Sequence, residues 1–483
     1  MDKWNSKILL ILAVAGGAIG IGNFLRFPTL FAQYGAWFLV PYFVSFFLLG
    51  LPLMLVEWTL GAYSRDKGEN SLATMLKKVF PNHIWVKYLG ILCVTCCLII
   101  AGYYIYIESW MLGYSVISLK GTFNTLPAEK LGEFLGNYTT FKSGTELGVI
   151  CLITLLITIF LNFYFVAKGV SKGVGNLIKW SMPILLIMSI LMLVKVLFTP
   201  GIGEGIKYMY RGEPSDLLNT KMWIDAASQM FFSLSVGFTS TYVYVTYSKN
   251  NLNIFSDGLT SSFMNMGIEV ILASFIAIPV SFLAFGDKMD EVAHSSSIAF
   301  GMVSMPAIFQ NIPGCSFWCF LWFLLLFLAA LTSSVSMVQV FVSYLCNKLK
   351  ISGVKSAWLN FLLFAVVAFT AVKLNGAIDE LDFWTNSIFM PIGALILISV
   401  VHALRGNFVK KFNENSKTKM PNSILFIIKY VTPIYLLLAI IPFVITSGKD
   451  VLFGNEITVE QWFCRGLIVV MMIIYGMILG KKD

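Results

Sequence analysis

The chain has 483 residues, of which 58% are hydrophobic and only 12% are charged, and its formal net charge is +9. A soluble domain carries roughly 25% charged residues, so this chain has too few charges to cover a soluble particle of its size. The composition therefore excludes a large soluble enzyme, a disordered scaffold and a nucleic-acid-binding protein, and it indicates a protein whose solvent is mostly lipid.

Apolar segments long enough to cross a bilayer recur along the whole chain. A spanning helix needs about 20 predominantly apolar residues, and we expect twelve such helices, near residues 8–32, 37–62, 84–119, 147–167, 174–198, 223–247, 255–285, 316–346, 355–374, 381–404, 423–446 and 461–480. No hydrophilic stretch between them is long enough for a separate domain. We therefore expect residues 1–483 to form one all-α integral membrane unit.

The first of these segments follows Lys3 and Lys7, as a signal peptide would. It is too long for one, and it ends in Arg26-Phe27-Pro28 instead of a small-residue cleavage site, so we interpret it as a retained span. Twelve spans place both termini on one side of the membrane. If that side is the cytoplasm, most lysines and arginines fall in inner segments, as the positive-inside rule requires. The positive charge thus predicts a multi-pass inner-membrane protein with cytoplasmic termini, and no nucleic-acid partner.

The first span is interrupted at membrane depth. Its residues 15–28 read AGGAIGIGNFLRFP, and each glycine costs about 1 kcal/mol relative to alanine inside a helix. A small-residue packing face would account for Gly16 and Gly20, but it leaves Asn23 and Arg26 unexplained. A broken helix, with free backbone amides and carbonyls lining a cavity, fits the pattern better.

The sixth span has a similar interruption, where residues 232–241 read FSLSVGFTST. Breaks in the first and sixth spans are typical of a five-plus-five inverted repeat, in which two broken helices face each other across the binding site. We expect the repeats to be residues 8–198 and 223–404, followed by two additional helices within 423–480.

Polar residues inside other spans are candidates for the same site: Tyr104, Asn265, Thr332, Ser333 and Ser334, with the carboxylates Glu57, Glu108 and Glu269. An intramembrane carboxylate is costly and usually functional, although a hydrogen-bonded structural glutamate is the alternative for each. Cys93, Cys96 and Cys97 have no histidine or carboxylate near them in sequence. We interpret them as small buried thiols and not as a metal site.

Several motifs together resemble the neurotransmitter:sodium symporter family, most of all its bacterial amino-acid transporters. They are AIGIGNFLRFP, PLMLVEWTLG, YYIYIESW, FFSLSVGF, MPAIF and LTSSVS, and the resemblance covers essentially the whole chain. It implies two sodium sites. The first would use the Ala18 carbonyl, Asn23, Ser233, Asn265 and the substrate carboxylate, and the second would use the Gly16, Ile19 and Ala329 carbonyls with the Thr332 and Ser333 hydroxyls. An all-oxygen shell suits a hard cation.

The resemblance also implies a substrate site. The substrate carboxylate would meet the Ile21 and Gly22 amides and the Tyr104 hydroxyl. The full expected set is Gly17, Ile21, Gly22, Ile100, Tyr104, Phe232, Ser233, Ser235, Phe238, Ser333 and Met337. Amine transporters of the family have an aspartate where this chain has Gly20, which favours a substrate with its own carboxylate. Chloride-dependent members have a neutral residue at the position of Glu269, and a fixed carboxylate there does what chloride would do, so we expect chloride-independent transport.

The gates match the family only in part. Arg26 and Asp382 would form an outer ion pair, with Tyr104 and Phe238 closing beneath it, while Gly173 and Pro183 match a pattern linked to unwinding of the fifth span. Trp4 and Tyr247 match the inner gate. However, Met1 and Asn347 stand where members typically pair an arginine with an aspartate. Thr239 also replaces a second glycine, which predicts a shorter break in the sixth span.

Together these features predict sodium-coupled symport, by alternating access, of a neutral hydrophobic or aromatic amino acid into a bacterial cell. Two alternatives stay open: transport of another small zwitterion, and a non-transporting amino-acid sensor of the same fold. A channel would need a polar stripe through several spans, whereas the polar cluster lies only at mid-depth. An enzyme is not expected, because His83, His294 and His402 fall in loops or at span ends. A monomer and a homodimer are both compatible with the sequence.

Overall fold

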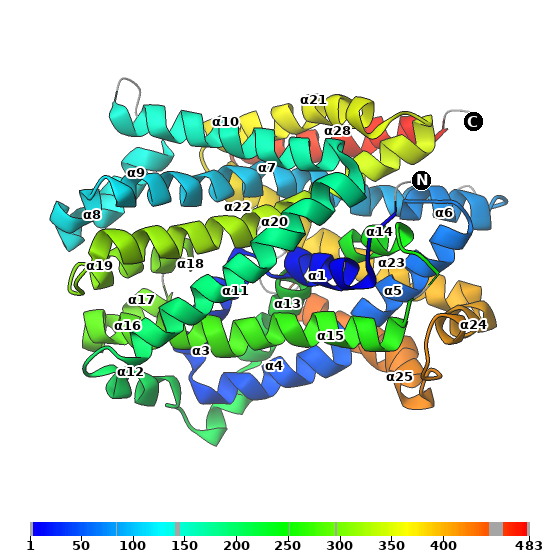
Figure 1. The fold of residues 1–483 in the computed structure, drawn as a ribbon. Coiled ribbons are helices and arrows are strands. Elements are labelled where there is room, and N and C mark those ends of the chain that lie inside the picture. Colours follow the sequence, from blue (N-terminus) through cyan, green and yellow to red (C-terminus); the bar gives the residue numbers. More distant parts are fainter. Residues whose placement is uncertain are drawn as a thin grey trace.

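The structure, a computed structural model, describes residues 3–83, 85–140, 145–250, 252–294, 297–443 and 457–480. All regular elements within these ranges are helices. Figure 1 shows them as one elongated bundle, with the N terminus and the C terminus at the same end. The expectation of an all-α membrane fold is confirmed.

Nine helices of the described part are long and apolar enough to cross a membrane. They are Ala36–Asp66, Val86–Leu119, Glu146–Ala167, Val170–Leu197, Ile254–Phe285, Cys315–Leu349, Gly353–Lys373, Ala377–Leu404 and Val459–Gly480. A tenth span is the pair Lys7–Ala18 and Ile21–Tyr34, which is bent by 62°. The predicted sixth and eleventh spans consist of shorter helices, and residues 444–446 of the latter lie outside the described ranges. The count of twelve spans therefore stays a prediction.

The first half of the chain contributes the following helices: α1 (Lys7–Ala18), α2 (Ile21–Phe24), α3 (Arg26–Tyr34), α4 (Leu39–Ser45), α5 (Leu51–Asp66), α6 (Leu72–Val79), α7 (Val86–Leu119), α8 (Thr122–Thr125), α9 (Leu131–Thr139), α10 (Glu146–Ala167) and α11 (Gly175–Leu197). The short helices α8 and α9 lie in the loop between the third and fourth predicted spans.

The second half contributes α12 (Ile202–Met209), α13 (Thr220–Leu234), α14 (Ser240–Thr246), α15 (Ile254–Gly267), α16 (Ser274–Phe285), α17 (Met289–His294), α18 (Ser297–Ala299), α19 (Met305–Phe309), α20 (Cys315–Leu349), α21 (Gly353–Lys373), α22 (Ala377–Asp382), α23 (Met390–Leu404), α24 (Gly406–Glu414), α25 (Asn422–Phe426), α26 (Thr432–Phe443) and α28 (Val459–Gly480).

The two longest helices, α7 and α20, pack along each other in the middle of the bundle. Peripheral helices turn their polar residues inward. On α10 the buried residues are Cys151, Thr154, Thr158, Asn162 and Val166, which follow one another at intervals of three or four residues. The opposite face carries exposed Leu152, Leu156 and Phe160. A polar stripe toward the protein and an apolar face outward is the arrangement that lipid imposes on a helix.

Both predicted helix breaks are present. Helix α1 ends at Ala18, and the backbone amide of Gly20 donates a hydrogen bond of 2.8 Å to Oδ1 of Asn23. In the sixth span three residues adopt left-handed backbone conformations between α13 and α14: Ser235 with φ 50°, Gly237 with φ 97° and Thr239 with φ 71°. Thr239 lies within the break, directly before α14, and whether it shortens the break stays a prediction.

Side chains of neighbouring helices bind the backbone that the second break releases. Glu57 on α5 accepts hydrogen bonds from the Gly237 amide at 2.9 Å and the Tyr242 amide at 3.1 Å. The thiols of Cys93 and Cys97 on α7 donate to the carbonyls of Gly237 and Phe238, at 3.6 and 3.3 Å. An unpaired backbone group in hydrocarbon costs several kcal/mol, so these contacts are what allow the break to persist.

Candidate functional site

A cavity of about 350 Å³ lies where the two breaks meet α7 and α20. Nine of the eleven predicted substrate residues line it: Ile21, Gly22, Ile100, Tyr104, Phe232, Ser235, Phe238, Ser333 and Met337. The other two, Gly17 and Ser233, lie behind this lining. The Gly17 carbonyl accepts a hydrogen bond of 3.0 Å from the Ser235 hydroxyl, and Ser233 belongs to a buried polar chain.

The Tyr104 hydroxyl marks the polar end of this cavity. It accepts a hydrogen bond of 3.2 Å from the backbone amide of Ile21, which is the first residue of α2 after the first break. A methyl group added at Gly20 would lie 2.8 Å from this hydroxyl and 3.3 Å from the Ser333 hydroxyl. Gly20 therefore leaves open the space in which an anionic group could meet the free amides and the phenol.

A chain of buried side chains runs from the first break to a carboxylate. Asn23 Nδ2 donates to Asn265 Oδ1 at 3.0 Å, Asn265 Nδ2 donates to the Ser233 hydroxyl at 2.6 Å, and that hydroxyl donates to Glu269 at 2.5 Å. All four side chains are at most 1% exposed. Amide, hydroxyl and carboxylate oxygens are the ligands that Na⁺ and other hard cations prefer. The structure thus brings together the three side chains expected at the first sodium site.

Glu269 is held by three residues on two helices. Tyr42 on α4 donates to it at 2.9 Å, and Ser233 and Gln229 on α13 donate to it as well. Gln229 also accepts a hydrogen bond of 2.8 Å from Arg26. The carboxylate therefore belongs to the same polar chain as the predicted ion ligands and the predicted outer gate.

The residues expected at the second sodium site lie on neighbouring helices. Helix α1 runs along α20, with Gly17 against Ser336 and Gly20 against Ser333. The Thr332 hydroxyl donates to the carbonyls of Leu328 at 3.2 Å and Ala329 at 3.0 Å, as hydroxyls in helices commonly do. The remaining expected ligands are the Gly16 and Ile19 carbonyls. Gly16 packs against Met182 of α11, the residue before Pro183.

The expected outer ion pair between Arg26 and Asp382 is not formed in this structure. Both residues line the cavity, but each side chain is bound elsewhere. Arg26 donates to Gln229 and Ser228 and lies 4.3 Å over the Phe232 ring. Asp382 accepts hydrogen bonds from Tyr103, at 2.7 Å, and from Asn386. These partners hold each of the two charges away from the other.

At the other end of the molecule, Trp4 and Tyr247 meet as expected. The Trp4 amide donates to the Tyr247 carbonyl at 3.1 Å, and the Trp4 indole donates to the Tyr244 carbonyl at 2.8 Å. Tyr247 in turn shares a hydrogen bond of 2.8 Å with Ser343 on α20. Asn347 donates to the Gly68 carbonyl at 3.3 Å, while Met1 lies outside the described residues. At Asn347, the position that the resemblance gives to an aspartate, the structure therefore has a neutral hydrogen bond.

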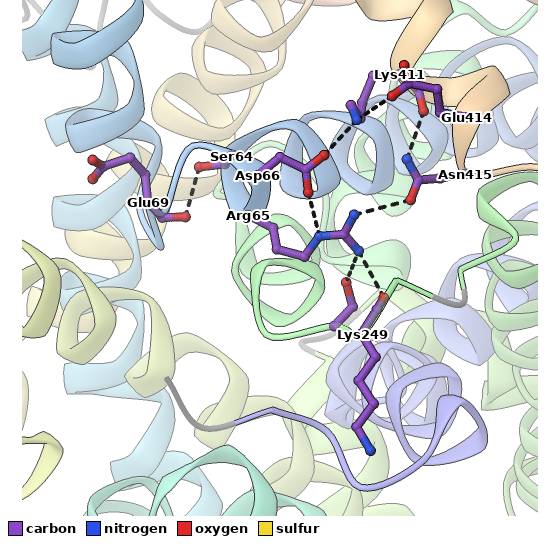
Figure 2. A network of polar contacts seen from close by, with 9 residues as sticks. Ser64, Arg65, Asp66, Glu69, Lys249, Lys411, Glu414 and Asn415 are labelled. Atoms are coloured by element: carbon purple, nitrogen blue, oxygen red, sulfur yellow. Dashed lines mark hydrogen bonds and ion pairs between the residues drawn. The ribbon is translucent and has the colours of Figure 1, made fainter.

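A charged network closes the same end further out (Figure 2). Arg65, at the end of α5, donates to the Lys249 carbonyl at 2.9 Å and to Asp66 at 2.8 Å. Lys411 on α24 pairs with Asp66 at 2.6 Å and with Glu414 at 2.5 Å. The network ties α5 to the loop after α14. Gly173, the other predicted gating residue, lies in the π-helical turn Val170–Val174 before α11.

Sequence reasoning missed several of these partners. Gln229, Tyr42, Tyr103 and Asn386 all bind a predicted functional side chain, yet none of them was among the candidates. The one available signal was that Gln229, like Asn23, is an amide near a break. Within the described ranges, no group of three or more His, Cys, Asp or Glu side chains has the arrangement of a metal site. Glu108, a candidate from the sequence, accepts a hydrogen bond of 3.2 Å from the side chain of Asn162.

The chain is similar to known proteins both in sequence and in fold. The model of the sodium:neurotransmitter symporter family matches residues 1–130 and 130–479. An uncharacterized sodium-dependent transporter of Methanocaldococcus jannaschii is 28% identical over 99% of this chain and 97% of its own length. An uncharacterized sodium-dependent transporter of Bacillus subtilis is 30% identical over 82% of this chain and 86% of its own. The crystal structure of MhsT in complex with L-phenylalanine has the same fold, with a TM-score of 0.78 and 24% identity over 91% of this chain and 99% of that one.

Proposed function

The chain belongs to the sodium:neurotransmitter symporter family, and from this premise we propose that it couples sodium entry to the uptake of a neutral amino acid. Membership makes it a sodium-dependent membrane transporter and not an enzyme. The observation that carries the proposal further is the juxtaposition of the Ile21 amide, the Tyr104 hydroxyl and Gly20, which has no side chain, at one end of the cavity. That end offers hydrogen-bond donors and space to a carboxylate, and no carboxylate side chain competes at Gly20.

The side-chain end of the substrate would lie among apolar residues. Ile100, Phe232, Phe238 and Met337 form this wall of the cavity. A hydrophobic or aromatic side chain replaces water there most favourably, since burial of apolar area gains about 25 cal/mol per Å². MhsT, which has the same fold, was crystallised with L-phenylalanine, an amino acid of this class.

Two sodium ions would bind beside the substrate. The first would take oxygens from Asn23, Asn265 and Ser233, from the Ala18 carbonyl and from the substrate carboxylate. The second would take the carbonyls of Gly16, Ile19 and Ala329 with the hydroxyls of Thr332 and Ser333. Inward movement of sodium supplies about 2.3 kcal/mol per charge for every 100 mV, before the concentration term. This work would concentrate the amino acid inside the cell.

Transport would be independent of chloride. The carboxylate of Glu269 reaches the first ion site through the Ser233 hydroxyl, which donates to it at 2.5 Å. The fixed negative charge of Glu269, one hydrogen bond away from the expected ligand Ser233, offsets the sodium charge in a medium of low dielectric constant, as a bound chloride otherwise would. We place the protein in the inner membrane of a bacterium, with both termini in the cytoplasm and with residues 8–198 and 223–404 as inverted repeats that alternate access to the site.

The test is thermal unfolding of the purified protein with each of the twenty amino acids, in sodium and in choline buffers. A substrate binds only the folded state and therefore raises the unfolding temperature. We expect hydrophobic or aromatic amino acids to stabilise the protein in sodium and not in choline. Stabilisation by no amino acid, or by the same amino acids equally in both salts, contradicts the proposal.

A further inference from the structure

A second cavity, of about 1090 Å³, opens at the inner face, by which we mean the end of the bundle that carries Trp4 and Tyr247. Three segments form its walls: the turn before α6 with α6 itself, the end of α10 with the turn that follows, and the end of α20 with the loop to α21. Figure 1 shows α6 and the N terminus at this same end of the molecule. None of the substrate or ion residues discussed above lines this cavity.

The walls of this inner cavity are strongly basic. Six lysines line it, Lys77, Lys78, Lys168, Lys172, Lys348 and Lys350. Among its described lining residues the only carboxylate is Glu69, which pairs with Lys78 at 3.2 Å. Lys168, Lys172 and Lys350 are exposed, and no ion pair in the described part of the chain includes them. A concave surface lined by one sign of charge concentrates ligands of the opposite sign.

The floor of the cavity is polar and incompletely satisfied. Gln339 is 4% exposed; its Nε2 donates to Ser343 at 2.7 Å, but its Oε1 has no hydrogen-bond partner. The Oδ1 atom of Asn70, which is 6% exposed, also has none. Buried acceptors without partners are rare in native proteins. They suit a ligand that brings hydroxyl donors as well as negative charge.

The cavity also borders the lipid-facing helices. Ala167 at the end of α10 and Gly353 at the start of α21 both line it. The outer faces of these helices carry exposed apolar residues, such as Leu156 and Leu362. A headgroup of the adjoining lipid leaflet can therefore reach the lysines without crossing the protein, while a soluble anion can enter from the aqueous side.

From these observations we propose that the inner cavity binds a phosphate group, carried either by a soluble anion or by an anionic phospholipid of the inner leaflet. Lysines from three separate segments converge on it, and the four oxygens of a phosphate can contact several ammonium groups at once. Unpaired acceptors at the floor accept hydrogen bonds from phosphate or glycerol hydroxyls. The proposal concerns a second site and depends on the transport function only in that the inner face is taken to be cytoplasmic.

Occupancy of this site would hold the inner face closed. The same cavity touches Tyr247, Gln339 and Asn347, whose hydrogen bonds join α14, α20 and the turn before α6. A phosphate that contacts lysines on α20 and on the α10–α11 turn links segments that must separate before the inner face can open. The ligand would therefore stabilise the state seen here.

The experiment measures the thermal unfolding of the purified full-length protein in an uncharged detergent, without sodium or amino acid. The probes are inorganic phosphate, dioctanoyl phosphatidylglycerol and dioctanoyl phosphatidylcholine, each titrated at constant ionic strength set with choline chloride. The test variant is Lys172→Gln with Lys350→Gln. The matched control is Lys130→Gln with Lys207→Gln, which removes the same charge from two exposed positions. Lys130 lies directly before α9, and Lys207 lies on α12. A third variant, Lys172→Arg with Lys350→Arg, keeps the charge.

We expect stabilisation of the wild type, of the control and of the arginine variant, with a half-saturating concentration at least about tenfold higher in the glutamine test variant. Stabilisation by phosphate and phosphatidylglycerol alike identifies the phosphate group itself as the ligand, and stabilisation by phosphatidylglycerol alone identifies a lipid. An equal response to phosphatidylcholine, or an unchanged response in the test variant, overturns the proposal. Sodium-dependent stabilisation of the test variant by an amino acid shows that it is folded, and this readout also separates failure of the second site from failure of the transport assignment.

Discussion

Nδ2 of Asn23, on α2 after the break in the first span, donates a hydrogen bond of 3.0 Å to Oδ1 of Asn265 on α15. Both side chains are fully buried, and neither helix would bury an amide at this depth without a partner. The contact ties the broken first span to the helix that carries the chain of hydrogen bonds to Glu269. A sodium ion bound between these two side-chain amides would replace the hydrogen bond and would contact both helices.

The first prediction concerns Asn23→Ala. Loss of one of the few oxygen ligands is expected to weaken the apparent affinity for sodium by at least about tenfold, or about 1.4 kcal/mol. The measurement is the sodium concentration that half-maximally supports amino-acid stabilisation. Asn360→Ala is the control, because Asn360 is equally buried but binds the Phe341 carbonyl and Tyr475, away from both breaks. It is expected to lower stability without changing the sodium dependence, and equal sodium dependence in both variants contradicts the site.

The second prediction compares two glycines of the first break. In Gly20→Ala the new methyl group would lie 2.8 Å from the Tyr104 hydroxyl, whereas in Gly22→Ala the nearest atom, Cβ of Phe232, is 3.8 Å away. Overpacking typically costs 1–3 kcal/mol, so Gly20→Ala is expected to weaken substrate binding by about tenfold or more. Gly22→Ala is expected to change it by less than about threefold. Isothermal titration with the stabilising amino acid distinguishes the two, and the reverse order would place the substrate elsewhere.

The third prediction concerns Glu269→Ser. Removal of the carboxylate leaves the sodium charge without its fixed counter-charge, so uptake by this variant is expected to require chloride. The measurement is uptake into proteoliposomes in chloride and in gluconate. Glu108→Gln is the control, because Glu108 binds Asn162 on α10 and has no contact with the sodium ligands. Chloride-independent uptake by Glu269→Ser, or a chloride requirement in the wild type, contradicts the role given to Glu269.

The fourth prediction concerns a buried ion pair close to Asp382. Arg465 on α28 pairs with Glu380 on α22 at 2.7 Å, and the side chains are 10% and 3% exposed. Glu380 lies two residues before Asp382. Arg465→Gln leaves a buried carboxylate without its cation and is expected to cost about 3 kcal/mol of stability. Adding Glu380→Gln is expected to recover part of this loss. Losses of stability that simply add in the double variant would show that the pair is not coupled.

The fifth prediction concerns pH and the network of Figure 2. Burial lowers the pKa of Lys411, but hydrogen bonds to Asp66 and Glu414 outweigh this effect and raise the pKa above its ordinary value of 10.5. The hydrogen bond from Lys411 lowers the pKa of Glu414 below its ordinary 4.5. A raised lysine pKa stabilises the fold below 10.5 and ceases to do so at more alkaline pH. A lowered glutamate pKa stabilises it above 4.5 and ceases to do so in acid.

The difference in unfolding temperature between the wild type and Lys411→Gln is therefore expected to be constant between pH 4.5 and pH 10.5 and to shrink outside this window. Because the partner carboxylates Asp66 and Glu414 are 36% and 44% exposed, solvent screens these pairs and the difference is expected to be small. A difference that changes steadily through neutral pH would assign the stabilisation to other groups.

The two helix breaks could be predicted from the sequence, because each contains residues that would destabilise a continuous membrane helix. A continuous lipid-facing helix would not be expected to contain glycines at 16, 17, 20 and 22 followed by Asn23. In the sixth span, the hydroxyl residues at 233 and 235 indicate a break in the same way. What surrounds the breaks was less visible. Glu57 could be a functional or a structural carboxylate from sequence alone, and only its contacts with the Gly237 and Tyr242 amides show that it binds the released backbone.

Partners that depend on rotamers and on packing between distant helices could not be predicted. Arg26 was expected to pair with Asp382, but Gln229 and Ser228 lie closer to the guanidinium, and Tyr103 and Asn386 bind the aspartate. Cys93 and Cys97 were expected to be small buried thiols, and they are buried, but their hydrogen bonds to carbonyls of the second break could not be predicted. A short polar side chain within an apolar run says that a partner exists, and the fold decides which residue it is.

The measurement that tests the central claim most directly is uptake of a radiolabelled amino acid into proteoliposomes that contain this protein, with sodium outside and choline inside. The amino acid is the one that most stabilises the purified protein. We predict accumulation above the external concentration, driven by the sodium gradient, and its loss both on equalising sodium and in Asn23→Ala. Equal uptake with and without the sodium gradient, or an undiminished gradient response in Asn23→Ala, would contradict a sodium-coupled symporter built around the first helix break.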